Sequence, residues 1–109
     1  MSKYRSRKVS VDDITFDSAK EARRYGELKL LERAGIISGL RLQVPYLLIP
    51  SQTDCRGKVV EHAVRYIADF VYQENGKEIV EDVKGMRTDV YKLKRKLMLY
   101  VHGITVKEV

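Results

Sequence analysis

The sequence predicts a single α/β domain in which a mixed sheet is flanked by helices, with the element order α-β-β-β-α-β. The chain has 109 residues, which is below the roughly 150 residues of an average domain. An Asn-Gly dipeptide separates two runs that are rich in β-branched and aromatic residues, the pattern of a β-hairpin. One capped helical segment precedes these runs, and another follows them before a final short strand.

The first helix is predicted over residues 19–34, a stretch that contains no proline and no β-branched residue. Ser18 followed by Glu21 fits a capping box, in which two side chains satisfy the first free backbone N–H groups of a helix. Gly35 fits the left-handed residue that ends a helix. The first helix therefore has a start and a stop signal in the sequence.

Three strands and a loop are predicted next. Leu40–Ile49 is a strand whose Pro45 indicates a bend or an edge position, because proline cannot donate to the ladder. The polar stretch Ser51–Lys58 is expected to be a loop. Val59–Tyr72 and Glu78–Val83 are the two strands of the hairpin around the Asn-Gly turn.

The second helix is predicted over Val90–Val101, capped by Thr88 or Asp89 and closed by Gly103. Its apolar side chains form one stripe that is expected to face the sheet. A last strand over Ile104–Val109 follows. Strand, helix and strand with short connections imply a right-handed crossover, so the last strand should run parallel to the strand that ends at Val83. The stripe consists of Val90, Leu93, Leu97, Tyr100 and Val101.

The chain divides into a basic N-terminal arm, residues 1–15, and one domain, residues 16–109, with an extended stretch over Val9–Phe16. Cys55 is the only cysteine, so no disulfide forms within the chain. The longest aliphatic stretch, Leu47–Ile49, is far shorter than the roughly 20 residues that span a bilayer. Without a leader-like N-terminus, these features predict a cytoplasmic protein with no membrane partner.

Basic side chains outnumber acidic ones by 21 to 15, and the excess lies in two windows. Residues 1–8 and 84–96 are strongly basic, whereas the remainder is slightly acidic. This distribution favours a polyanionic partner over a general effect on solubility. A solvated helix face and a charged tail are the alternative interpretation. The predicted nucleic-acid contacts are Lys3, Arg5, Arg7, Lys8, Arg87, Lys92, Arg95 and Lys96.

The hairpin predicts a pair of opposed acids. If Asn75 and Gly76 form the turn, Asp69 lies opposite Asp82, and directly opposed Cβ atoms are about 5 Å apart. Like charges at that distance destabilise a sheet. Lys84 lies on the same face as Asp82 but compensates only one of the two charges, so a divalent cation such as Mg²⁺ is favoured. An ordinary ion pair with Lys84 is the alternative.

Alternation along the hairpin assigns its other side chains to faces. Ile67, Asp69 and Val71 should share one face with Val80, Asp82 and Lys84. The opposite face should carry Tyr66, Ala68, Phe70 and Tyr72 beside Ile79, Glu81 and Val83. This register leaves Glu81 unexplained. Either it pairs with Arg23 or Arg24, or a bulge has rotated the strand.

Two helical residues are candidates for the same site. Lys94 lies at the border of the apolar stripe of the second helix, where it either leans toward the sheet or extends past the border into water. Glu21 shares a helical face with Tyr25 and Leu28, which would allow it to point inward. The capping box with Ser18 explains the same glutamate without a functional role.

These residues resemble the motifs of the PD-(D/E)XK nuclease superfamily. Asp82-Val83-Lys84 is similar to its acid-x-lysine signature, Asp69 to the preceding acid, and Glu21 to the acid on its first helix. Lys94 matches an additional basic position. The resemblance covers about residues 16–109 and implies a restriction-endonuclease-like core. Ala68 stands where the name-giving proline would be. The phrases around Asp17-Ser18, Glu81–Gly85 and Tyr91–Lys94 also resemble a small phage and prophage family of uncharacterised endonuclease-like proteins.

The resemblance implies Mg²⁺-dependent hydrolysis of DNA phosphodiester bonds, with Mn²⁺ as an alternative metal. Asp69, Asp82 and Glu21 would bind the metal, Lys84 would position the attacking water, and Lys94 would complete the catalytic set. The expected substrate is branched DNA, by analogy with small Holliday-junction resolvases, and a homodimer would present two sites to two strands. A phage-encoded protein would act in the bacterial host cytoplasm.

Two other classes of protein share some of these features. A nucleic-acid-binding protein with a nuclease-like fold but no catalysis would need the basic windows and not the opposed acids, which weaken binding to phosphates. A structural or regulatory phage protein with a decayed nuclease fold would keep the same residues without turnover. Zinc chemistry is disfavoured because His62, His102 and Cys55 lack ligand spacing.

Overall fold

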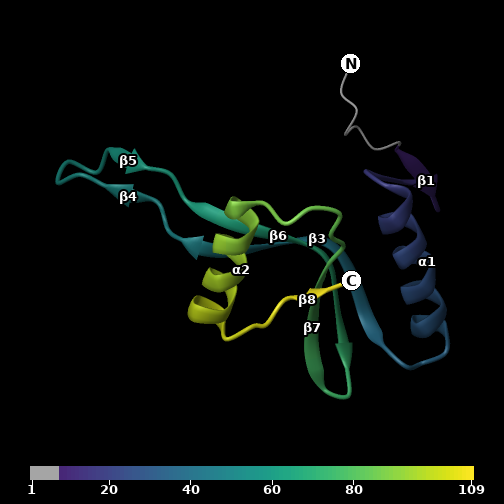
Figure 1. The fold of residues 1–109 in the computed structure, drawn as a ribbon. Helices are drawn as coiled ribbons and strands as arrows, with labels where there is room; N and C mark the ends of the chain where they lie inside the picture. The colour runs from purple at the N-terminus through teal and green to yellow at the C-terminus, as the bar shows by residue number, and fades with distance from the viewer. Residues whose placement is uncertain (1–7) are drawn as a thin grey trace.

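The structure is a computed structural model, and it describes residues 8–109. Figure 1 shows a bent sheet with one helix on each side and a long two-stranded arm that projects away from it. The elements are β1 (Val9–Val11), β2 (Ile14–Phe16), α1 (Ala19–Arg33), β3 (Ser38–Ile49), β4 (Gln52–Thr53), β5 (Val59–Glu61), β6 (Val64–Glu74), β7 (Lys77–Asp82), α2 (Asp89–His102) and β8 (Lys107–Glu108).

The central sheet is mixed and has the strand order β3-β6-β7-β8. The pairs β3–β6 and β6–β7 are antiparallel, and β7–β8 is parallel, as the strand-helix-strand connection predicted. With the short ribbons β1–β2 and β4–β5 left aside, the element order is α1-β3-β6-β7-α2-β8. Pro45 lies in β3, at one edge of the sheet, where its missing N–H is tolerated.

The first helix begins and ends close to where the sequence predicts. Ser18 is its N-cap, and the hydroxyl accepts a 3.1 Å hydrogen bond from Glu21 N. After Ala34 the chain turns at Gly35, which has φ +77°. The predicted start of the helix at Ser18 and its end at Gly35 are therefore confirmed.

Residues 9–16 differ from the expected extended arm. They form a small antiparallel hairpin whose turn residues, Asp12 and Asp13, both have positive φ. Aspartate tolerates this conformation better than most residues, which allows the chain to fold back on itself. Phe16 is buried, and the remaining apolar side chains of the hairpin pack against the α1 cluster. The segment before residue 16 therefore belongs to the domain from Val9 onward.

The second hairpin has the predicted turn and register. Asn75 and Gly76 have φ values of +54° and +75°, as a two-residue hairpin turn of this type requires. The ladder runs from Glu74↔Lys77 to Phe70↔Glu81, and β7 ends one residue later, at Asp82. The same register continued by one step brings Asp69 next to Asp82.

The apolar core consists of two clusters, and they divide β6 in a way that alternation does not predict. Tyr66 and Ala68 pack with Val71 and Val80 under α2, whereas Phe70 and Tyr72 pack under α1. The prediction that Tyr66, Ala68, Phe70 and Tyr72 share one packed face is therefore wrong. The change occurs at Asp69. Opposite it on β3, Gln43 has φ +52°, a left-handed residue that twists the ribbon sharply.

The second helix has the predicted ends but a different buried side. Thr88 is the N-cap, and Gly103, with φ +67°, ends the helix. Tyr91 and Met98 are the buried residues. The predicted inward stripe is mostly exposed: Val90 is 63% accessible, Leu93 58%, Tyr100 87% and Val101 45%. A polar contact fixes how α2 is rotated about its own axis, because the Tyr91 hydroxyl donates a 2.6 Å hydrogen bond to Glu108.

The predicted loop over Ser51–Lys58 contains β4 and leads into β5, and together they form the arm seen in Figure 1. Within it, Asp54 Oδ1 accepts hydrogen bonds from the backbone N–H groups of Arg56 and Lys58, which shape the tip. Among the residues that the structure describes, no helix is long and apolar enough to cross a membrane.

Candidate active site

A cleft of about 570 Å³ lies where the start of α1, the middle of β6, the end of β7 and the start of α2 meet. All five side chains that the sequence predicts to be catalytic line this cleft. They come from α1, β6, the end of β7 with the segment that follows it, and α2. The five are Glu21, Asp69, Asp82, Lys84 and Lys94.

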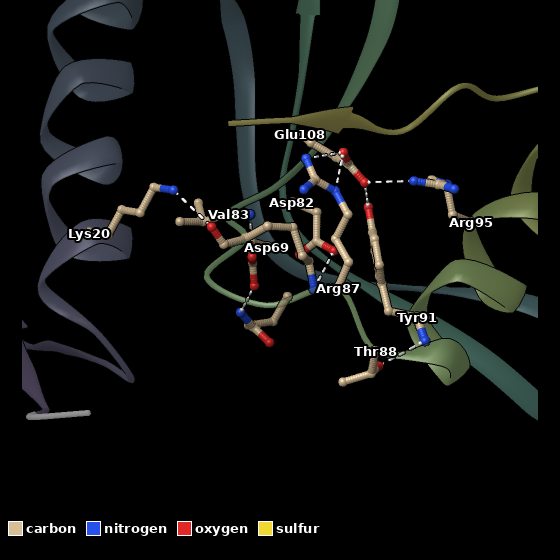
Figure 2. A network of polar contacts seen from close by, with 11 residues as sticks. Lys20, Asp69, Asp82, Val83, Arg87, Thr88, Tyr91, Arg95 and Glu108 are labelled. Atoms are coloured by element: carbon tan, nitrogen blue, oxygen red, sulfur yellow. Dashed lines mark hydrogen bonds and ion pairs between the residues drawn. The ribbon is translucent and has the colours of Figure 1, made fainter. Parts of the chain in front are cut away.

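Asp69 and Asp82 lie side by side in this cleft, as Figure 2 shows. Asp82 is only 4% exposed, and Asp69 accepts a 2.8 Å hydrogen bond from the backbone N–H of Val83 through Oδ2. Burial, and then the adjacent Asp82 carboxyl, raise the pKa of Asp69 to about 7, and the charge of Glu21 adds to this. Near pH 7 a large share of the Asp69 carboxyl groups is therefore protonated, and a bound cation would favour the charged form instead.

Lys84 is held against Asp82 by two contacts. Its Nζ atom lies 2.9 Å from Asp82 Oδ2 and 3.8 Å from the centre of the Tyr91 ring. The Lys84 backbone is fixed as well, because its carbonyl accepts a 2.8 Å hydrogen bond from Lys20 Nζ. The ammonium group is thus positioned at the acid pair rather than extended into solvent.

Two buried oxygen atoms in the cleft accept or donate no hydrogen bond within residues 8–109. They are Tyr66 Oη and Asp82 Oδ2, the latter because the Lys84 ammonium is close but not aligned for a hydrogen bond. Burial, and then the charge of Asp82, raise the pKa of the Tyr66 phenol. The Lys84 ammonium compensates Asp82 Oδ2, whereas Tyr66 Oη has no partner within residues 8–109. An unpaired buried polar atom is unfavourable, so this hydroxyl favours a ligand that satisfies it.

Glu21 reaches the cleft through a residue that the sequence did not reveal. Gln43 Nε2 lies 3.4 Å from Glu21 Oε2 and 3.4 Å from Asp69 Oδ1, so one amide bridges the two carboxylates. Burial, Asp17 and Asp82 raise the pKa of Glu21. Only half of the expected capping box forms in the described residues, since the Glu21 side chain turns toward Gln43 and not back to Ser18.

Glu81 is explained by the first of the two alternatives. It is fully buried on the α1 side, where Arg24 donates two hydrogen bonds to it, of 2.9 and 2.6 Å, and the Tyr72 hydroxyl donates another. Although burial alone would raise its pKa, Arg24 and Tyr72 hold the pKa of Glu81 below the usual value. Glu81 is therefore part of the core and does not face the cleft.

The predicted nucleic-acid contacts divide into three groups. Lys8, Lys92 and Lys96 are exposed. Arg87 and Arg95 instead pair with Glu108, at 2.8 and 3.1 Å, and Figure 2 shows both converging on that carboxylate. Glu108 carries one negative charge and so compensates only one of the two guanidinium groups, but both side chains are held by the fold, and their contact with nucleic acid stays a prediction. Lys3, Arg5 and Arg7 lie outside the described residues.

The side chains of the cleft suit a hard divalent cation. Carboxylate oxygens are the ligands that Mg²⁺ prefers, and it commonly binds through one or two carboxylates while keeping waters that phosphate oxygens replace. Asp69 and Asp82 supply two such groups. Among residues 8–109, no group of three or more acidic, histidine or cysteine side chains is arranged to hold a metal ion. A cation in this cleft would therefore depend on the two carboxylates and on water.

Comparison with known proteins gives one match. A family model described as "Protein of unknown function (DUF1064)" covers residues 1–107. No curated protein and no solved structure matches the chain.

Proposed function

The chain belongs to the DUF1064 family, and from its cleft we propose that it is a metal-dependent endodeoxyribonuclease with a restriction-endonuclease-like core of the PD-(D/E)XK type. The observation that carries this proposal is the acid pair with its lysine: Asp69 and Asp82 adjoin in a cleft, and Lys84 Nζ lies 2.9 Å from Asp82. An ordinary ion pair would need one acid, and the second acid here has no compensating charge of its own.

In the proposed reaction Asp69 and Asp82 would hold Mg²⁺ or Mn²⁺, and Glu21 would complete the set directly or through a water molecule. The bound cation would act as a Lewis acid on the phosphate and lower the pKa of the attacking water. Gln43 keeps Glu21 and Asp69 oriented toward the same point, since its amide contacts both carboxylates. Tyr66 Oη, unpaired beside Asp82, is available as a donor to a ligand in the cleft.

Lys84 and Lys94 would act on the substrate. The Lys84 ammonium is fixed between Asp82 and the Tyr91 ring, where it would neutralise charge that develops on the phosphate and orient the attacking water. Lys94 lines the cleft from α2 and is half-buried, as expected for a lysine that leans toward the sheet. We assign it to a phosphate oxygen of the bound strand.

The proposed substrate is branched DNA. The exposed lysines of α2, Lys92 and Lys96, suit the phosphate backbone. Contacts to phosphates position a protein on DNA but carry no sequence information. This supports an enzyme that selects a DNA structure, as Holliday-junction resolvases do, over one that reads a sequence.

The test is cleavage of labelled linear, flapped, gapped and four-way DNA with Mg²⁺ or with a chelator. We expect Mg²⁺-dependent cutting of the branched substrates, its loss in Asp69→Asn and Asp82→Asn, and a loss of roughly 100-fold or more in Lys84→Ala. Asp13→Asn is the matched control, because Asp13 is exposed and does not line the cleft, and it should cleave normally.

Calorimetric titration with metal separates the roles of these residues. Lys84→Ala should keep most of its affinity for Mg²⁺, whereas Asp82→Asn should lose it. A wild-type protein that binds all four DNA substrates and cleaves none of them would overturn the proposal in favour of a non-catalytic nucleic-acid-binding protein.

A further inference from the structure

One side of α2 is apolar and has no cover in the described structure. Its side chains are spaced by three and four residues, the spacing of a helix-packing seam. Leu97 is partly buried against the core, but the others are largely exposed, Tyr100 at 87%. We call this set the α2 apolar face: Val90, Leu93, Leu97, Tyr100 and Val101.

The β4–β5 arm, residues 52–61, also exposes apolar side chains that nothing covers in the described structure. Val59 and Val60 of β5 are 45% and 55% exposed, and residues 52–61 contribute nothing to either core cluster. In Figure 1 the arm extends well beyond the sheet and both helices. A two-stranded ribbon with no packed face is marginally stable in water. The arm therefore also lacks the apolar cover that would hold it in place.

The amount of exposed surface supports a missing partner. The accessible area is 7864 Å², whereas a monomeric protein of 12.6 kDa typically exposes about 6,200 Å². The difference exceeds the roughly 800 Å² that each partner contributes to a standard interface. The Cα radius of gyration, 16.4 Å, is likewise larger than the about 13 Å of a compact domain of this length.

We propose that a second copy of this chain covers both surfaces, with the arm of each protomer lying across the α2 apolar face of its partner. A two-fold arrangement buries both surfaces of both copies, because each protomer offers one arm and one α2.

Charge selects this arrangement over two alternatives. Lys94 borders the α2 apolar face on one side and Lys96 on the other, so two α2 helices packed directly about a two-fold axis would bring like charges together. The arm has no net charge, so packing it on the α2 apolar face adds no such repulsion. DNA is disfavoured on the arm because residues 52–61 hold two basic and two acidic side chains and no net charge.

The oligomeric state is the first test, and it needs neither DNA nor metal, so its outcome does not depend on the proposed nuclease activity. Sedimentation equilibrium of the wild type should give twice the mass of the chain. Leu93→Glu on the α2 apolar face and Val60→Glu on the arm should each give monomers with an unchanged circular dichroism spectrum. Leu99→Glu is the matched control, since Leu99 is a 54% exposed leucine on another side of α2, and it should stay dimeric.

The second test locates the arm. Cys55, the only cysteine, is exposed near the tip of the arm, so a nitroxide attached there marks the arm without further substitution. Mixed with a ¹⁵N-labelled Cys55→Ser chain, the spin-labelled chain should broaden amide resonances of Leu93 and Tyr100 in the other copy and leave those of the β1–β2 hairpin sharp.

Three outcomes would overturn the inference: a wild type that sediments as a monomer, Leu99→Glu that dissociates as fully as Leu93→Glu, or broadening confined to residues outside α2. A monomer whose α2 resonances change only on addition of DNA or lipid vesicles would assign the surface to that ligand and not to a second copy.

Discussion

The charge state of Asp69 links the cleft to the stability of the fold. Its pKa is raised from 3.8 to about 7, first by burial and then by Asp82. Between these values the folded chain binds more protons than the unfolded chain, so stability falls as the pH rises. The stabilising contribution of the protonated form is complete below about pH 4 and lost above about pH 7.

We therefore expect Asp69→Asn to flatten this dependence. In urea denaturation without divalent cations, the variant should exceed the wild type in stability by at least about 1 kcal/mol near pH 8 and by less near pH 5. Asp13→Asn should follow the wild type at both values. Parallel curves for the wild type and Asp69→Asn would show that this carboxyl titrates normally.

Arg24 and Glu81 form a buried pair whose two members should behave differently alone and together. Removing the arginine by Arg24→Met leaves the Glu81 carboxylate buried without its partner, which should cost about 3–5 kcal/mol of unfolding free energy. Adding Glu81→Leu should recover much of that loss. If the double variant is as unstable as the single one, the pair itself contributes net stability, and chemical denaturation distinguishes the two cases.

The residues of the cleft differ in how far the sequence could predict them. Asp69, Asp82 and Lys84 belong to one hairpin whose register follows from Asn75-Gly76, so local rules bring them together. Gln43 could not be found this way. Its place beside Asp69 depends on the pairing of β3 with β6 and on a left-handed backbone for which glutamine is no signal.

Among the elements, α2 shows that a periodic apolar pattern predicts that a helix forms but not which of its sides is buried. The N-cap, predicted at Thr88 or Asp89, and the stop at Gly103 can be found in the sequence because caps act within one turn. The apolar stripe predicts packing on the sheet, because an amphipathic helix usually buries its apolar side. Tyr91 and Arg95 both bind Glu108, a residue of β8 that no helical pattern contains, and these contacts turn the stripe outward.

The contacts around α2 also limit which of the basic side chains in residues 84–96 can bind DNA. With Arg87 and Arg95 paired to Glu108, we expect Lys92→Gln with Lys96→Gln to weaken DNA binding for all sequences and to reduce the salt slope by up to about 2. Arg87→Gln should change the slope little and lower thermal stability instead. Binding measured by fluorescence anisotropy over a salt series checks both, and a steep unchanged slope in the double variant would remove these lysines from the interface.

At the scale of the whole molecule, the chain consists of a folded body and an arm. The body was predictable in outline: its element order and both helices follow from strand runs, caps and one turn. The arm was not. Val59 and Val60 have the composition of a buried strand, and a sequence does not reveal that a strand is covered by nothing within its own chain.

Because the arm contributes nothing to either core cluster, we expect the rest of the domain to fold without it. Replacing Gln52–Glu61 by an Asn-Gly turn should leave the melting temperature at low protein concentration within about 4–8 °C of the wild type, the shift that 1 kcal/mol produces in a domain of this size. The wild type should also melt at higher temperature as its concentration rises, and the shortened chain should not. An unfolded shortened chain would show that the arm is part of the core.

The early closure of the β6–β7 hairpin has a consequence for how the chain folds. A hairpin forms in about 1–10 μs, whereas Arg24 must cross 57 residues of sequence to reach Glu81. The two acids can thus meet before α1 packs on the sheet, and they do so against their own repulsion unless a proton or a cation is already present. If the acid pair binds a divalent cation as proposed, we expect such ions to aid the folding of the newly made chain, well before it has a cleft in which to use them.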